Sequence, residues 1–245
     1  MNILLSNDDG YQADGIRILE EVLVSHGHTV YVSAPEGEQS GKSHSMTIRG
    51  EIAVTKYGER HFHISGTPAD CIVYSHRSAL FPVNFDAVIS GINHGYNLST
   101  DVIYSGTCAA ARQATMYGIK AIAVSLQRKN EEKLRLLAAF VADNLERFLS
   151  VIPEGAFMNI NAPLSFDGSS YEKAGLGFIV YDDQVSIKET HGDRIILEIT
   201  DCDLIHHPSS SKYRADHEIC NDGKASISIV NILPDVDEKA MEFLR

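Results

Sequence analysis

The chain has 245 residues, of which 44% are hydrophobic and 22% are charged, and its formal net charge is −12. This length and composition predict a globular protein with one large domain, or one domain and an appendage, and no apolar stretch reaches the about 20 residues of a membrane span. The acidic balance excludes a general binder of nucleic-acid duplexes or of membrane surfaces, because such proteins present a basic face.

The cysteines and the N-terminus indicate a compartment. Cys71, Cys108, Cys202 and Cys220 form no CxxC pair. A disulfide framework is not typical of a chain of this size. The first residues lack the basic and apolar regions of a signal peptide. We therefore expect a cytoplasmic protein.

The chain up to Pro163 alternates between strand and helix patterns. A short apolar run at residues 3–5 is typical of a strand buried on both faces. The apolar spacing and turn residues predict strands at 28–33, 50–64 (with a turn near Gly58), 85–90, 119–125 and 157–160, and helices at 16–26, 67–80, 107–117 and 131–149. This alternation predicts a doubly wound, mostly parallel α/β sheet. The first strand lacks GxGxxG, which disfavours a dinucleotide-binding fold.

The pattern changes after Pro163. Residues 164–190 are expected to be irregular, residues 194–200 and 225–232 are expected to be strands, and residues 238–244 a short helix. This material is too small to form a large core by itself. We therefore divide the chain into a catalytic α/β domain, residues 1–163, and a β-hairpin-rich extension, residues 164–245, expected to act as an oligomerisation arm.

Two adjacent carboxylates follow the first strand. Asp8 and Asp9 stand immediately before Gly10, at the strand's carboxyl end, where open α/β sheets bind ligands. Neighbouring like charges repel, and a site that holds both usually supplies a cation. The alternative is an Asx-type turn with solvated carboxylates.

Two other predicted strands lead to polar residues that can join this pair. Ser40 lies in the long polar loop after the second strand, and Asn93 follows the strand at 85–90. Carboxylate, hydroxyl and amide oxygens are hard ligands, which suit Mg²⁺ or Mn²⁺ rather than a metal that prefers sulfur or imidazole. The sequence thus predicts a site for one divalent ion.

The segment Ser105-Gly106-Thr107 precedes a predicted helix. Backbone N–H groups at a helix N-terminus bind anions, and the two hydroxyls add donors, so this segment is a candidate phosphate cradle. The alternative is a plain helix cap in front of a packed, alanine-rich helix.

Several of these stretches together resemble the SurE family. The similarity rests on NILLSNDDG at the start, QSG at 39–41, GTPADC at 66–71 and the run from Ser90 to Thr107. The resemblance implies a Rossmann-like fold and a metal-dependent phosphatase that acts on nucleoside 5′- and 3′-monophosphates, with an extension that forms a homodimer or homotetramer. By the same resemblance, the expected metal ligands are Asp8, Asp9, Ser40 and Asn93, and the expected phosphate-binding residues are Gly41, Asn97, Ser105, Gly106 and Thr107.

Two departures from the family pattern stand out. Ser99 occupies a position where the family has Gly, which would permit a positive φ that Ser adopts less readily. Val230 and Asn231 replace a Thr-Pro pair late in the chain. Neither position is among the expected ligands.

Three functional alternatives follow from the same residues. Phosphate monoester hydrolysis can use direct attack by water, with Asp8 or Asp9 as base, or one of them as nucleophile through an aspartyl-phosphate; the absence of a DxD motif favours water. A non-catalytic nucleotide or phosphate sensor could hold the same metal. A glycosyltransferase with a nucleotide-sugar metal fits the early strand-end position less well.

Overall fold

The computed structural model describes residues 1–234, so the helix expected at residues 238–244 lies outside the described residues. Its elements are β1 (Asn2–Ser6), α1 (Asp14–Ser25), β2 (Thr29–Pro35), β3 (Val54–Gly58), β4 (His61–Ile64), α2 (Pro68–Arg77), β5 (Ala87–His94), α3 (Asp101–Tyr104), α4 (Gly106–Met116), β6 (Lys120–Leu126), α5 (Glu131–Val151), β7 (Ala156–Ala162), β8 (Tyr171–Lys173), β9 (Phe178–His191), β10 (Arg194–His207), α6 (Asp216–Asn221) and β11 (Ala225–Asn231). None of the helices within these residues combines the length and the apolar character that crossing a membrane takes.

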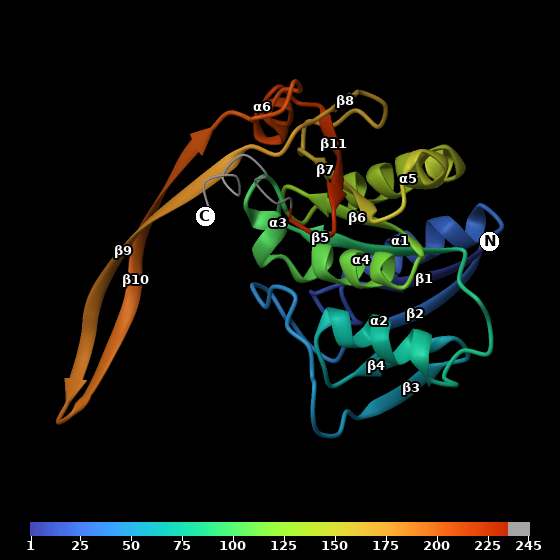
Figure 1. The fold of residues 1–245 in the computed structure, drawn as a ribbon, viewed down its shortest axis with the longest axis horizontal. Helices are drawn as coiled ribbons and strands as arrows, with labels where there is room; N and C mark the ends of the chain where they lie inside the picture. The colour runs from blue at the N-terminus through green and yellow to red at the C-terminus, as the bar shows by residue number, and fades with distance from the viewer. Residues whose placement is uncertain (235–245) are drawn as a thin grey trace, which may run out of the picture.

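A mixed, mostly parallel sheet forms the centre of the molecule (Figure 1). Over the described residues its strand order is β3-β4-β2-β1-β5-β6-β7-β11-β8. β1 lies between β2 and β5 and is parallel to both, with Leu5 opposite Val32 on one side and Ile89 on the other. Ile3, Leu4 and Leu5 are completely buried, as the apolar run predicts. The doubly wound α/β fold is therefore confirmed.

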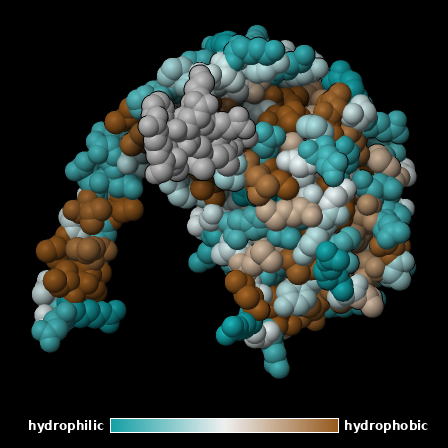
Figure 2. Space-filling model, in the orientation of Figure 1, coloured by the Kyte–Doolittle hydropathy of each residue, from teal (hydrophilic) through white to brown (hydrophobic). Residues whose placement is uncertain are grey.

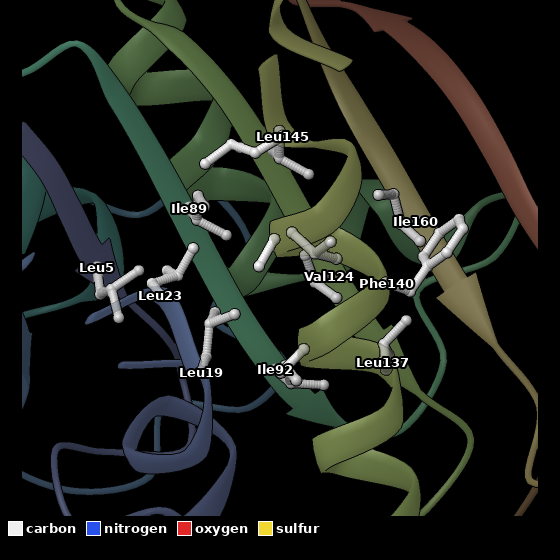
Figure 3. Packing of buried hydrophobic residues seen from close by; sticks show 14 of the residues in the cluster. Leu5, Leu19, Leu23, Ile89, Ile92, Val124, Leu137, Phe140, Leu145 and Ile160 are labelled. Carbon is white, nitrogen blue, oxygen red and sulfur yellow. The ribbon is translucent and has the colours of Figure 1, made fainter. Parts of the chain in front are cut away.

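Helices cover both faces of this sheet. Leu19 and Leu23 of α1 pack with Leu137 of α5 against strand residues such as Ile89 and Val124 on one face (Figure 3). On the other face, Ile72 of α2 and the alanines of α4 pack against Leu4 and Val88. The apolar stripe of α5 arises from the helical spacing of its buried leucines, and this spacing predicted the helix correctly.

The long β9 corrects the expectation that residues 164–190 are irregular. Within residues 1–234, β9 pairs only with the antiparallel β10, and together they form a two-stranded ribbon that projects from the body (Figure 1). β10 contains the strand expected at residues 194–200, so this half of the ribbon was predicted. β9 is largely exposed and its apolar residues are interrupted by Asp182 and Asp183, so no buried, alternating pattern marks it.

The remaining segment after Pro163 returns to the central sheet. β11 runs antiparallel to β7, and the short β8 pairs in parallel with the start of β11. The strand expected at residues 225–232 is thus present, as the next strand of the main sheet beyond β7. Strands from both sides of residue 163 share one sheet, while the β9–β10 ribbon alone stands away from it.

Candidate active site

Asp8 is buried at the carboxyl end of β1, where it faces the start of α4. Its side chain is surrounded so closely that the residue is only 4% exposed. Thr107 Oγ1 donates a hydrogen bond of 2.5 Å to Asp8 Oδ1. Gly106 lies directly behind: a Cβ built there would be 2.7 Å from Asp8 Cβ and 2.9 Å from Asp8 Oδ2. The close approach of α4 to β1 therefore requires glycine at this position.

Asp9 lies beside the end of β5. Its Oδ2 accepts a 3.2 Å hydrogen bond from the backbone N–H of His94 and lies 3.9 Å from His94 Nδ1. The side chain is 15% exposed, so Asp9 is the more accessible of the two carboxylates. Asp8 and Asp9 thus belong to one site but are supported by different elements.

The electrostatics of the pair favour a cation. Burial raises the pKa of Asp8 to about 6, opposed by the Thr107 hydrogen bond and assisted by the charge of Asp9. Burial also raises the pKa of Asp9, while His94 lowers it and Glu38 raises it. Within residues 1–234, neither carboxylate forms an ion pair with a lysine or an arginine. Two adjacent acids shielded from solvent, with no lysine or arginine beside them in the described residues, are stabilised by a bound positive charge.

The loop that carries Ser40 follows β2 and is hydrogen-bonded to the backbone of Asp8. The N–H of Gln39 donates a 2.7 Å hydrogen bond to the Asp8 carbonyl oxygen. Ser40 itself is exposed, and its Oγ donates to Glu38 Oε1 at 3.0 Å. Gly41 follows with a φ of 68° and has open space around its Cα. Ser40 therefore lies in a loop that is bonded to the Asp8 backbone, and its hydroxyl is directed to Glu38.

The far end of this loop is held by α3 and α4. Ser43 donates from its N–H to the Tyr104 carbonyl at 2.8 Å and from its Oγ to the Ile103 carbonyl at 2.6 Å. His44 Nε2 lies 2.9 Å from Gln113 Oε1 of α4. The loop thus spans from β1 to the helices that begin beside Asp8.

The two asparagines predicted from the sequence differ in environment. Asn93 lies half-buried in β5, and its Nδ2 donates to the Gly95 carbonyl at 3.0 Å, which leaves its Oδ1 as an oxygen ligand. Asn97 is buried, and its Nδ2 donates to Ser125 Oγ at 2.9 Å. The Asn97 backbone also bonds to the side chains of Asn159 and Asn161. Asn97 therefore anchors the segment between β5 and α3 to the central sheet.

Ser105 is the N-cap of α4. Its Oγ accepts a 3.0 Å hydrogen bond from the N–H of Cys108, as the cap alternative predicts. The Thr107 hydroxyl, expected to face a phosphate, is instead bonded to Asp8. The segment Ser105–Thr107 therefore both caps α4 and supports the Asp8 carboxylate.

The donor set fits a hard divalent cation. Asp8 and Asp9 offer carboxylate oxygens, and the buried Oδ1 of the preceding Asn7 has no hydrogen-bond partner, since only its Nδ2 is engaged, with the Gly10 carbonyl. Within residues 1–234, no three His, Cys, Asp or Glu side chains group together. Mg²⁺ is often held by only one or two carboxylates, with amide or hydroxyl oxygens, water or a substrate phosphate at the other positions.

Sequence reasoning missed Glu38 and Asn7. Glu38 is hydrogen-bonded to Ser40 and close enough to Asp9 to raise its pKa. Its position two residues before Ser40, in the same polar loop, is the one signal that could have drawn attention to it. The unpartnered oxygen of Asn7 carries no sequence signal beyond its place next to Asp8.

Comparisons with known proteins identify relatives of this chain. The family model described as Survival protein SurE matches residues 3–179. The 5′-nucleotidase SurE of Nitrobacter winogradskyi is 37% identical over 196 residues, which cover 75% of this chain and 77% of that protein. The 5′-nucleotidase SurE of Treponema pallidum is 42% identical over 168 residues, which cover 66% of this chain and 90% of that protein.

A solved structure extends the likeness to the whole chain. The crystal structure of the SurE protein from Aquifex aeolicus superimposes with a TM-score of 0.80 at 27% sequence identity, covering 100% of this chain and 98% of that one. The matched family region, residues 3–179, contains every predicted site residue. On this evidence the chain belongs to the SurE family.

Proposed function

We propose that the protein is a metal-dependent phosphatase that hydrolyses nucleoside 5′- and 3′-monophosphates. The observation that carries the proposal is the Asp8–Asp9 pair, in which Asp8 is buried and Asp9 is 15% exposed; within residues 1–234 neither acid has a lysine or arginine partner, and the pair lies at the carboxyl edge of a parallel sheet. Relatives named 5′-nucleotidase SurE support the substrate class. A binding site for a free anion alone would not place two carboxylates at its centre.

One Mg²⁺ or Mn²⁺ ion would be held by Asp8, Asp9, Ser40 and Asn93. When bound, such an ion polarises a phosphoryl oxygen and lowers the barrier to attack by water. To bind the ion, the exposed Ser40 side chain would exchange its hydrogen bond to Glu38 for the metal. Thr107 and the His94 N–H keep the two carboxylates in fixed orientations.

The protein's own groups supply the remaining chemistry. We favour direct attack by water, with one of the two carboxylates accepting its proton, and the departing nucleoside oxygen takes up a proton as the P–O bond breaks. The phosphate would lie against Gly41, Asn97 and the backbone of Ser105, Gly106 and Thr107, since the hydroxyls of Ser105 and Thr107 are already engaged with the Cys108 N–H and with Asp8. Of these, Gly41 has open space around it, and the Asn97 side chain is bonded to Ser125 of β6.

Phosphate release tests the proposal directly. Purified protein is incubated with a panel of 5′- and 3′-mononucleotides in Mg²⁺ or Mn²⁺, and inorganic phosphate is measured. Release that stops with a chelator and resumes on adding metal supports the proposal. Tight, metal-dependent binding of mononucleotides without phosphate release identifies the protein as a sensor instead, and rejects hydrolysis.

We further propose that the β9–β10 ribbon, within the extension 164–245, is an arm for a homodimer or homotetramer. It exposes large apolar side chains that a monomer has no reason to present, and Figure 2 shows them gathered along the projecting ribbon. The exposed fraction is between 57% and 64% for Val185, Ile187, Ile195, Leu197 and Ile199.

We also propose that the protein is cytoplasmic. The four cysteines are free thiols, which supports this location.

A further inference from the structure

A buried hydrogen bond between a hydroxyl and a carboxylate links the segment between β5 and α3 to α6. Ser99 has a φ of 55°, and within residues 1–234 it and Ser43 are the two non-glycine residues with a positive φ. Side chains with a Cβ rarely take this conformation, so the surrounding structure must hold it. The holding group is Asp216, at the first position of α6 and completely buried.

The Asp216 carboxylate accepts both polar hydrogens of Ser99. The Ser99 N–H donates to Oδ2 and the Ser99 hydroxyl donates to Oδ1, each at 2.6 Å. The N–H groups of Gly177 and His217 also donate to Oδ1, at 3.3 Å and 3.0 Å. Four donors thus satisfy a carboxylate for which the described residues provide no lysine or arginine partner. We name this arrangement the Ser99–Asp216 clamp.

The clamp sets the start of α3. The Ser99 carbonyl accepts from the Val102 N–H at 3.4 Å, so Ser99 begins the first turn of that helix. Next to it, Thr100 Oγ1 donates to the Ile179 carbonyl of β9 at 2.7 Å. Both contacts bring residues from the last third of the chain against the segment that leads into the active site.

α3 contacts or adjoins two parts of the active site. Its end carries the carbonyls of Ile103 and Tyr104, which hold Ser43 in the loop of Ser40. The next residue is Ser105, the cap of the helix whose Thr107 fixes Asp8. Because α3 is only four residues long, a shift at Ser99 has little structure in which to dissipate before it reaches Thr107.

We propose that Asp216 is a positioning residue for the active site. By holding Ser99 in the left-handed conformation it fixes α3, and α3 fixes both the Ser40 loop and the Ser105–Thr107 segment against Asp8. The kinetic part of this inference rests on the proposed function. The structural part stands independently, because it concerns the order of residues 100–108.

The test compares Asp216→Ala with a double variant that also carries Ser99→Gly. Glycine takes a positive φ without a holding group, so the clamp is needed less when residue 99 is glycine. Asp216→Ala is expected to lower kcat/KM by up to roughly a hundredfold, as misplaced catalytic groups do. Adding Ser99→Gly is expected to recover most of that loss. Adding Ser99→Ala, which removes the hydroxyl but keeps the Cβ, is expected to recover none.

Amide hydrogen exchange gives a readout that does not depend on activity. Asp216→Ala is expected to lose protection at residues 100–108 while α5 stays protected, and Ser99→Gly is expected to restore it. Asp216→Asn, which keeps the shape and one acceptor oxygen, provides a milder variant if Asp216→Ala does not fold. The control is Asp222→Ala, which removes an exposed carboxylate that is paired with Arg214 just after α6.

The outcomes separate the inference from the proposed function. Lowered thermal stability with unchanged kcat/KM and unchanged exchange at residues 100–108 overturns the positioning role. Equal behaviour of the Ser99→Gly and Ser99→Ala double variants overturns it as well. If the wild-type protein releases no phosphate, the proposed function fails, and the exchange pattern still decides whether Asp216 positions the segment.

Discussion

The hydroxyl of Thr107 donates its hydrogen bond to Asp8, across 99 positions of sequence. This contact joins the first turn of α4 to the end of β1, and it gives a buried carboxylate a charge-assisted hydrogen bond. The Ser105–Thr107 segment therefore contributes to the proposed site by orienting an acid, in addition to the anion-binding capacity of a helix N-terminus.

Thr107→Ala should weaken catalysis more than stability. Loss of a hydrogen bond to a charged group costs roughly 1.5–3 kcal/mol, on the order of tenfold to a hundredfold in kcat/KM if Asp8 is the affected group. Thr107→Ser keeps the hydroxyl and is the matched control, with activity close to wild type. Steady-state kinetics and a melting curve on the same samples test this. Normal kcat/KM in Thr107→Ala would show that Asp8 needs no such partner.

Ser105→Ala should have the opposite balance, because Ser105 caps α4 without touching either carboxylate. Loss of an N-cap costs about 1 kcal/mol of stability. We therefore expect a lower melting temperature, with kcat/KM per folded molecule nearly unchanged. A large kinetic loss at unchanged stability would instead place the Ser105 hydroxyl on the substrate.

Gly106→Val should damage the site severely. A Cβ at this position would lie 2.7 Å from Asp8 Cβ and 3.0 Å from Pro68 Cγ, so either α4 or Asp8 must move. We expect near-complete loss of metal binding and of phosphate release, together with reduced stability. Gly118→Val is not a suitable control because of its φ of 77°, whereas Gly37→Ala, with open space around it, is. Retained metal affinity in a folded Gly106→Val protein would contradict this account of Asp8.

Removal of either acid should abolish the metal site. Asp8→Asn and Asp9→Asn each delete a charged ligand, so Mn²⁺ affinity measured by calorimetry should fall steeply and phosphate release should drop by orders of magnitude. Asp14→Asn, an exposed acid paired with Lys129 and Arg17, serves as the control. A chelator should reduce the wild type to the level of the variants. Wild-type Mn²⁺ affinity in either variant would remove that residue from the ligand set.

The ribbon should determine assembly. Ile187→Glu or Leu197→Glu places a charge within the exposed apolar surface of β9–β10, where these two residues are cross-strand neighbours. Light scattering of the wild type is expected to show a dimer or tetramer, and either variant should shift it toward monomer. Lys188→Glu, on the same ribbon, is the control for a charge change outside the apolar side chains, and it also breaks the Lys188–Glu198 ion pair. A wild-type monomer at micromolar concentration would reject the arm.

His44 should make the loop sensitive to acid. Burial is the main cause that lowers its pKa below 6.5, Arg112 lowers it further, and the Gln113 contact opposes both. A depressed pKa means that the unfolded chain binds the proton more readily, so the stability is present above about pH 6.5 and is lost as the pH falls toward the folded-state pKa. His44→Gln should therefore lose less melting temperature than wild type between about pH 7.5 and about pH 5.5. Parallel melting curves would contradict this.

The local sequence determined much of this protein. The uninterrupted apolar run of β1 predicted a strand buried on both faces, as observed. The acidic pair after it predicted a ligand site at the carboxyl edge of the sheet. The helical spacing of α5 and the Thr67–Asp70 capping box at the start of α2 are likewise signals within a few residues. Such signals are readable because periodicity and caps depend on near neighbours in the chain.

Tertiary structure alone decided the partners. Thr107 and Asp8 are separated by 99 positions in the sequence, and Ser99 and Asp216 by 117. No local pattern encodes contacts over such separations. The positive φ of Ser99, which its side chain disfavours, is adopted because a buried carboxylate accepts both of its polar hydrogens. In the exposed ribbon, the part of β10 at residues 194–200 was predicted from its apolar residues, whereas β9 was not, because a strand with both faces in water leaves little burial pattern in its sequence.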